Sequence, residues 1–249
     1  MIIFITGASA GFGEAISKRF IKEGHKVIAL ARREEKLQKL QNELGENYQF
    51  IACDVNNVEK IKNDLKNLPE GFRNIDVLIN NAGLALGLES ADKANIEDWE
   101  MMINTNITAL IKLTHLLLPK MVERKKGHII NIGSIAGSYP YPGGNVYGGT
   151  KAFVKQFSLN LRADLYDKNI RVTNIEPGLC GGSEFSIVRF RGDKTKAKQV
   201  YENTTPLLPE DVAEAVFWCT SLPNHVNINR IELMPTTQAP AALNVAKSK

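Results

Sequence analysis

The sequence predicts one α/β domain, a doubly wound sheet of seven parallel strands with helices on both faces. Two patterns lead to this expectation. Short apolar runs alternate with longer segments of helical periodicity along the whole chain, which is the order of repeated βαβ units. The apolar runs also lack polar alternation, as do strands that are buried on both faces.

The expected strands and helices follow one another in this order. The strands are the apolar runs at 2–5, 26–31, 49–53, 76–79, 128–132, 171–175 and 228–233. The helices lie at 14–22, 34–44, 58–68, 96–124, 148–166 and 210–222, with a break in the fourth near 104–106. In the first helix, Ile16 and Phe20 share one face, and Gly24 provides a stop. No repeat or linker divides the chain, so we expect a single domain over residues 1–249.

The stretch from 178 to 209 is the least regular part of the sequence. Strand and helix patterns fade there, and Gly178, Gly181, Gly182 and Gly192 interrupt it. A long irregular segment inside a compact domain is often a lid over a functional site. We therefore expect a substrate lid at about 178–209.

Composition argues against several other classes of protein. The net charge of +4 is too small and too dispersed for a nucleic-acid-binding surface. Three cysteines without paired spacing and four dispersed histidines predict neither a disulfide framework nor a metal site, and they fit a reducing cytoplasm. No apolar run approaches the roughly 20 residues of a membrane helix, and the first residues do not resemble a signal peptide. We expect a cytoplasmic protein that binds a small molecule rather than nucleic acid, a membrane or a metal.

A glycine-rich turn follows the first expected strand, in the sequence TGASAGFG. Glycines let the backbone turn tightly and approach a phosphate, and the N-terminus of the next helix attracts an anion. This placement is typical of dinucleotide-binding Rossmann folds. The candidate residues of the loop are Gly7, Ala8, Ser9, Ala10, Gly11, Phe12 and Gly13. A tight turn without a ligand is the alternative.

Two arginines after the second strand favour NADP over NAD. In dinucleotide folds an acidic residue near this point holds the ribose of NAD, whereas an arginine accommodates the 2′-phosphate of NADP. Here Arg32 and Arg33 occupy these positions, and a guanidinium binds phosphate as a charged fork. We expect Ser9 to donate a further hydrogen bond to the same phosphate. The alternative is that both arginines are solvated residues at the start of a helix.

The next two strands also end in residues suited to a ligand at the carboxyl edge of the sheet. Asp54 and Val55 follow the third strand, and we assign them to the adenine. Asn81, Ala82 and Gly83 follow the fourth, and we expect them to line the cofactor.

Tyr147 and Lys151 form the candidate catalytic pair. On a helix, residues four apart lie on one face at about 6 Å. A neighbouring ammonium lowers the pKa of a phenol and so prepares it for proton transfer near neutral pH. Ser134, at the end of the fifth strand, offers a hydroxyl that holds the substrate oxygen. With a nicotinamide that carries hydride, this set suits the interconversion of an alcohol and a carbonyl.

In order and spacing, these motifs resemble the short-chain dehydrogenase/reductase family over nearly the whole chain. They are TGxxxGxG at 6–13, NNAG at 80–83, Ser134, and YxxxK at 147–151. The resemblance implies that Asn106 is a fourth catalytic residue, which anchors a water in a proton relay to Lys151, and that Lys151 also holds the nicotinamide ribose. It further implies a homotetramer and cofactor contacts from Pro177, Gly178, Leu179 and Ser183.

Within this family, the sequence is similar to NADP-dependent dehydrogenases of small 3-hydroxy acids, including serine dehydrogenases and malonic semialdehyde reductases. The similar segments are NNAGLALG at 80–87, GGNVYG at 143–148 and EPGLCGGSEFS at 176–186. The implied substrates are L-serine, L-allo-threonine, 3-hydroxypropionate and 3-hydroxyisobutyrate, with 3-oxo acids or semialdehydes such as malonic semialdehyde as products.

The implied substrates all carry a carboxylate. Arg189 and Arg191 in the expected lid are the candidate partners of this group, together with Ser134 and Tyr147 at the hydroxyl. Two other functions remain open. One is an NADPH-dependent reductase of a diketone, sugar or pterin, and the other is a dinucleotide-binding sensor without catalysis.

Overall fold

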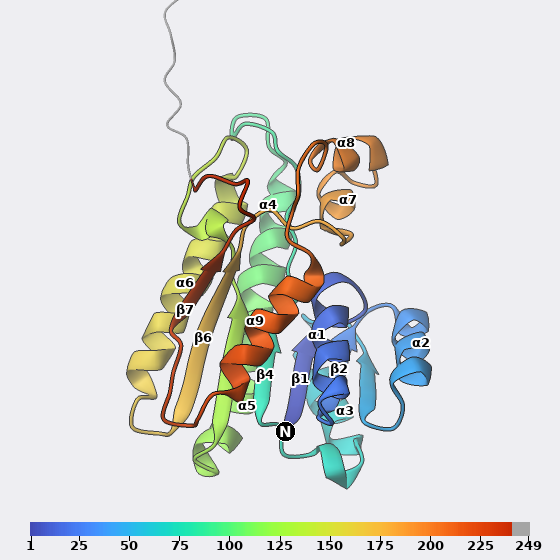
Figure 1. Cartoon of the computed structure of the whole chain (residues 1–249), viewed down its shortest axis with the longest axis vertical. Helices are drawn as coiled ribbons and strands as arrows, with labels where there is room; N and C mark the ends of the chain where they lie inside the picture. The colour runs from blue at the N-terminus through green and yellow to red at the C-terminus, as the bar shows by residue number, and fades with distance from the viewer. Residues whose placement is uncertain (241–249) are drawn as a thin grey trace, which may run out of the picture.

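The structure is a computed structural model that describes residues 1–240. Its centre is a seven-stranded sheet in the order β3-β2-β1-β4-β5-β6-β7 (Figure 1). The strands are β1 (Ile2–Thr6), β2 (Lys26–Ala31), β3 (Tyr48–Ala52), β4 (Val77–Asn80), β5 (Gly127–Ile132), β6 (Ile170–Pro177) and β7 (Arg230–Leu233). All neighbouring strands pair in parallel. The predicted doubly wound sheet is therefore confirmed.

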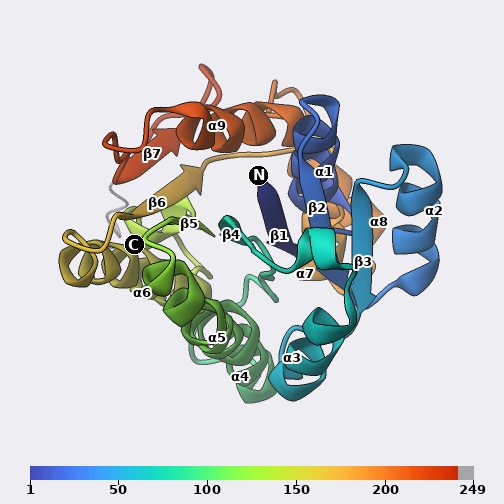
Figure 2. The same cartoon turned by 90° about the horizontal axis from the view of Figure 1, so that it is seen from below.

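Helices cover both faces of the sheet (Figure 2). One face carries α1 (Gly11–Lys22), α2 (Glu34–Leu44) and α9 (Pro209–Ser221). The other carries α3 (Val58–Asn67), α4 (Ile96–Ile103), α5 (Ala109–Glu123) and α6 (Asn145–Asp164). This arrangement leaves the carboxyl edge of the strands open to loops and to the segment after β6.

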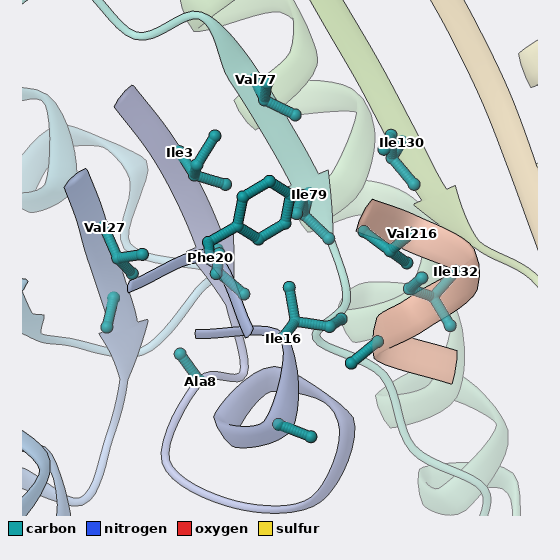
Figure 3. Close-up of a cluster of buried hydrophobic side chains, with 14 of the residues drawn as sticks. Ile3, Ala8, Ile16, Phe20, Val27, Val77, Ile79, Ile130, Ile132 and Val216 are labelled. Atoms are coloured by element: carbon teal, nitrogen blue, oxygen red, sulfur yellow. The ribbon is translucent and has the colours of Figure 1, made fainter. Parts of the chain in front are cut away.

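Alternate residues of β1 point into two hydrophobic cores, because successive side chains of a strand lie on opposite faces. Ile3 and Ile5 belong to the same core as Phe20 of α1 and Val216 of α9 on one face. Figure 3 shows Ile3 in this core with Phe20 and Val216. On the other face, Phe4 belongs to the core that includes residues of α3, α5 and α6. The sheet is thus packed against a hydrophobic core on each face, and these cores fix the positions of the strand ends.

Two helices begin earlier than the sequence predicts. Helix α1 begins at Gly11 and α6 at Asn145, each three residues before the expected start. Glycine and asparagine favour turns. The hydrophobic periodicity therefore does not show that the helices already begin at these residues. As a result, the end of the glycine-rich turn and Tyr147 both lie within the first turn of a helix.

The predicted break near 104–106 is a π-helical turn, η2 (Asn104–Thr108), that joins α4 to α5. Such turns within helices often mark functional sites, and this one carries Asn106. The continuous stretch Ile96–Glu123 is long and apolar enough to cross a membrane by length and composition alone. In the fold its residues Leu113 and Leu117 belong to the core under the sheet, as in the core helix of a globular domain.

The segment 178–209 contains two short helices that the sequence does not predict, α7 (Phe185–Arg189) and α8 (Lys194–Gln199). They lie beyond the carboxyl ends of the strands (Figure 1). Backbone hydrogen bonds join the two ends of the segment, from Gly181 N to Leu207 O at 2.8 Å and from Leu207 N to Leu179 O at 2.9 Å. The segment is therefore a closed unit, and its role as a substrate lid stays a prediction.

Candidate active site

A cavity of about 1000 Å³ lies at the carboxyl ends of the strands. Open α/β sheets bind ligands at this edge, and the volume is at the upper end of the usual range for small-molecule sites. It is large enough for a dinucleotide and a small substrate together. The predicted site residues that line it are Gly7, Ser9, Ala10, Gly11, Phe12, Arg32, Arg33, Asp54, Val55, Asn81, Ala82, Gly83, Ser134, Tyr147, Lys151, Pro177, Gly178, Leu179, Ser183 and Arg189.

Four predicted residues are not among those lining the cavity. Ala8 is fully buried in the core, and Asn106 is buried on η2 behind the cavity. Gly13 supports the shape of the loop, since a Cβ at this position would lie 2.4 Å from the carbonyl oxygen of Gly7. Arg191 forms an ion pair with Asp98 at 2.6 Å. The structure therefore separates Arg191 from Arg189, which the sequence treats alike.

The turn after β1 has the shape that a phosphate group requires. Gly7 and Gly11 have φ angles of 67° and 55°, in the left-handed region that favours glycine. Ala10, at the N-cap of α1, has no side chain that could bond to the first helical turn. The N–H groups of this turn are therefore available to an anion in the cavity.

Arg33 and Ser9 form the candidate 2′-phosphate site. Arg33 donates from Nε and Nη2 to Ser9 Oγ at 3.3 and 3.2 Å. Its Nη1 pairs with Glu184 at 2.6 Å, and Lys36 pairs with the same carboxylate at 2.8 Å. The hydrogen bond from Lys36, followed by that from Arg33, lowers the pKa of Glu184. The cations after β2 are thus linked both to the glycine-rich turn and to the segment 178–209.

Ser134, Tyr147 and Lys151 come together in the cavity, as predicted. Ser134 follows β5, and the other two residues lie on the first turns of α6. Lys151 Nζ lies 5.9 Å from the centre of the Tyr147 ring and donates a hydrogen bond to the carbonyl of Ile132 at 2.8 Å. Tyr147 and Lys151 are only 8% and 7% exposed, so the pair is held within the protein.

The net shift of the Tyr147 pKa is opposite to the predicted lowering, because burial is its largest cause. Burial raises the pKa of Tyr147 to about 12, while hydrogen bonding with Ser134 and the charge of Arg189 act in the opposite direction. Burial also lowers the pKa of Lys151 to about 8, because the ammonium loses hydration. Burial therefore favours the protonated phenol of Tyr147, which is the form that donates a proton.

Asn106 is held beside this pair by three hydrogen bonds. Its Oδ1 accepts from Leu84 N at 2.9 Å, and its Nδ2 donates to Leu84 O at 2.9 Å and to Thr150 Oγ1 at 3.0 Å. A Cβ on Gly83 would lie 3.3 Å from Asn106 Oδ1 and 3.5 Å from Lys151 Nζ. Gly83 therefore keeps the space between the amide oxygen and the ammonium open.

Arg189 lies next to the candidate proton donor, with its Cζ 5.7 Å from the centre of the Tyr147 ring. Its guanidinium is fixed, because Nη2 donates to Tyr141 Oη at 2.7 Å and Nε donates to Gly87 O at 3.1 Å. The ring of Phe185 packs against Tyr147, with 5.9 Å between ring centres. Tyr141 and Phe185 are not among the residues predicted from the sequence. The aromatic residue between Pro140 and Pro142 is a signal for the former, whereas no pattern indicates the latter.

The described residues 1–240 contain no evident metal-binding cluster. Within them, acidic, histidine and cysteine side chains do not gather in groups of three or more that could hold a metal ion. The polar side chains that line the cavity are hydroxyls, amides, arginines and one lysine, together with the carboxylates of Asp54 and Glu184 and the thiols of Cys53 and Cys180.

Comparisons with known proteins relate these features to characterised relatives. Residues 1–189 match the family model described as short chain dehydrogenase. The NADP-dependent 3-hydroxy acid dehydrogenase of Salmonella typhi is 62% identical over 248 residues, which cover 100% of both chains. The serine 3-dehydrogenase of Rhizobium radiobacter is 50% identical over 243 residues, which cover 98% of this chain and 97% of its own.

Two solved structures share the whole fold. The closed form of serine dehydrogenase complexed with NADP⁺ superposes with a TM-score of 0.98 at 60% identity, with 100% of both chains covered. Serine dehydrogenase from Escherichia coli superposes with a TM-score of 0.85 at 56% identity, over 96% of this chain and 100% of its own.

Proposed function

The chain belongs to the short-chain dehydrogenase family, and from this premise we propose that it is an NADP-dependent dehydrogenase of small 3-hydroxy acids. Its substrates are L-serine, L-allo-threonine, 3-hydroxypropionate and 3-hydroxyisobutyrate, and its products are 3-oxo acids or semialdehydes such as malonic semialdehyde. One observation carries the proposal, the fixed guanidinium of Arg189 beside the Tyr147 ring. A cation at this distance from a proton donor suits a short substrate with a hydroxyl at one end and a carboxylate at the other.

NADP(H) is the cofactor, and the cavity contains a suitable group for each of its parts. The turn of residues 7–13 would hold the diphosphate, Arg33 and Ser9 the 2′-phosphate, and Asp54 with Val55 the adenine. When it is bound, the nicotinamide supplies hydride chemistry that no side chain of the protein provides. The remaining work of the protein is to bind the substrate, orient it and move one proton.

The proton passes between Tyr147 and the substrate oxygen. In carbonyl reduction the phenol donates its proton to this oxygen, and in alcohol oxidation it takes the proton back. Ser134 donates a hydrogen bond to the same oxygen, and Arg189 holds the carboxylate, so the substrate is oriented at both ends. Lys151 is mostly protonated at pH 7, given its pKa of about 8. Its charge favours the phenolate that remains after the proton has left.

Replacing Arg189 with methionine should lower kcat/KM for 3-hydroxy acids by about 10- to 100-fold, because a hydrogen bond to a charged group contributes about 1.5–3 kcal/mol. Activity on a neutral secondary alcohol should change much less. Arg191→Met is the matched control, since it makes the same change in the same lid at a residue that pairs with Asp98. Equal losses in the two variants, or equal losses on acids and neutral alcohols, would show that Arg189 does not bind the carboxylate.

A substrate screen separates this function from the alternatives. NADP⁺ reduction is measured with the four 3-hydroxy acids and with simple secondary alcohols, and the best substrate is repeated with NAD⁺. Turnover of neutral alcohols alone would favour a reductase of a diketone, sugar or pterin. A protein that binds NADP⁺ but turns over none of them would be a sensor, although the presence of Ser134, Tyr147, Lys151 and Asn106 argues against this class.

We further propose that the protein is a homotetramer in the cytoplasm. Exposed aromatic residues support an interface between subunits. Phe153 of α6 is 38% exposed and stacks on the half-buried ring of Phe157 at 5.6 Å, and Trp218 of α9 is 51% exposed. Buried thiols at Cys53 and Cys219 fit a reducing compartment. Light scattering measures the mass, and a monomer in solution would contradict the assembly.

A further inference from the structure

Thr150 lies between Asn106 and the backbone of Tyr147. Its side chain is 1% exposed and is not among the residues that line the cavity. Its Oγ1 donates a hydrogen bond to the carbonyl of Tyr147 at 2.8 Å and accepts one from Asn106 Nδ2 at 3.0 Å. One buried hydroxyl therefore connects two of the four candidate catalytic residues without touching a ligand.

The hydroxyl of Thr150 determines which end of the Asn106 amide faces it. A threonine hydroxyl has a single hydrogen, and here the carbonyl of Tyr147 takes it. Only a donor can then bond to Thr150 Oγ1, and this donor is the amide nitrogen of Asn106. Leu84 imposes the same choice, because its N–H faces Oδ1 and its carbonyl faces Nδ2. A flipped amide would lose all three bonds in a buried place, at a high cost in free energy.

In this orientation the amide oxygen lies at the space beside Gly83, which the ammonium of Lys151 also borders. A Cβ on Gly83 would be in contact with both Asn106 Oδ1 and Lys151 Nζ, at 3.3 and 3.5 Å. The two atoms therefore border the same narrow space, one as an acceptor and the other as a donor. A reversed amide would place its NH₂ group in this space in place of the oxygen, and two donors would then border it.

We infer that Thr150 is a positioning residue for the reaction, because its hydroxyl holds the Asn106 amide with Oδ1 directed to the side of Lys151. The inference rests on the proposed function, in which Tyr147 and Lys151 carry out the proton chemistry. Thr150 acts only through Asn106 and through the first turn of α6, and it makes no contact of its own with the substrate.

Ser158 provides a matched control on the same helix. It is 2% exposed, donates to Val154 O at 2.7 Å and accepts from Asn131 Nδ2 at 2.8 Å. The donor and acceptor pattern is that of Thr150, but the amide belongs to Asn131 of β5, which is not among the candidate catalytic residues. A loss of buried hydrogen bonding can therefore be compared at the two sites.

The experiment compares Thr150→Val, Thr150→Ser and Ser158→Ala with the wild-type enzyme on its best substrate. We expect Thr150→Val to lower kcat about 10-fold, because the Asn106 amide loses the acceptor that holds its orientation. The solvent isotope effect on kcat should rise, because a slowed proton transfer limits the rate to a greater extent. The Kd of NADP⁺ should stay unchanged. Thr150→Ser should restore both kinetic values, and Ser158→Ala should lose stability without altering either.

Three results would overturn the inference. They are wild-type kcat and isotope effect in Thr150→Val, failure of Thr150→Ser to restore them, and a similar kinetic loss in Ser158→Ala. If Thr150→Val does not fold, Thr150→Ala removes the same hydroxyl from a smaller side chain and has the same expected kinetics. Failure of the proposed function is seen separately, as the absence of 3-hydroxy acid activity in the wild-type enzyme.

Discussion

Replacing Tyr147 with phenylalanine should lower kcat about 10³-fold and leave the Kd of NADP⁺ near its wild-type value. General acid–base groups contribute about 10²- to 10⁴-fold to a rate, and Tyr147 is the phenol in contact with Ser134. Phenylalanine keeps the ring that packs against Phe185, so the shape of the site is retained while the proton is lost. Kinetics are followed by NADPH absorbance, and coenzyme binding by titration.

Tyr141→Phe provides the comparison for this result. It removes another phenol of the cavity lining, the one that accepts a hydrogen bond from Arg189. We expect a higher KM for the acid, because the guanidinium loses one of its fixed partners, and a kcat within a few-fold of the wild-type value. Full activity in Tyr147→Phe would exclude Tyr147 as the proton donor. A larger loss of kcat in Tyr141→Phe than in Tyr147→Phe would indicate that Tyr141 is the proton donor instead.

The second large effect is on stability, and it concerns a buried carboxylate near the end of β6. The side chain of Glu176 is 0% exposed and pairs with Arg230 of β7 at 2.8 Å. Its other oxygen accepts from Asn174 Nδ2 at 2.6 Å. Arg230→Met should lower the free energy of unfolding by about 3 kcal/mol at neutral pH, because removing one partner leaves an uncompensated buried charge.

This loss should depend on pH. Burial raises the pKa of Glu176, and Arg230 draws it back down. Without Arg230 the folded-state pKa rises further above that of the unfolded chain, which is about 4.3. A group whose pKa is higher in the folded state loses stability as pH rises through that folded value. The variant should therefore approach wild-type stability in acid and fall furthest behind at neutral pH.

Urea unfolding at pH 4.5 and 7.5, at one protein concentration, measures this difference. Lys168→Met is a suitable control, because its ion pair with Asp167 is exposed on both sides and contributes about 0–1 kcal/mol. If Arg230→Met loses the same free energy at both pH values, the effect comes from packing and not from the charge of Glu176.

The sheet was predictable because parallel strands buried on both faces leave continuous apolar runs, as at Lys26–Ala31. The starts of the helices were harder to predict than the strands, since Gly11 and Asn145 in their first turns are residue types typical of loops. The residue pattern at Asn104–Thr108 does not distinguish a π-helical turn from an α-helical one, so this turn could not be predicted. The two lid helices are short and depend on packing, so local pattern does not reveal them.

The candidate site was predictable where it follows from topology. Ser134 and the residues after β4 lie at strand ends, and a parallel sheet brings strand ends together. Contacts between side chains from distant segments were not predictable. Examples are the hydrogen bond between Arg189 and Tyr141 and that between Asn106 and Thr150. The pKa of Tyr147 was predicted in the wrong direction because its burial is a property of the fold, whereas its spacing from Lys151 is visible in the sequence.

Arg33 already has an anionic neighbour before any phosphate arrives, since Glu184 of the lid pairs with it at 2.6 Å. If Arg33 binds the 2′-phosphate as proposed, this phosphate exchanges with a carboxylate of the protein itself. The preference for NADP over NAD would then depend on how much more strongly Arg33 binds the 2′-phosphate than it binds the carboxylate of Glu184. Salt screens the incoming phosphate and the outgoing carboxylate alike, so these two effects oppose each other in the binding constant.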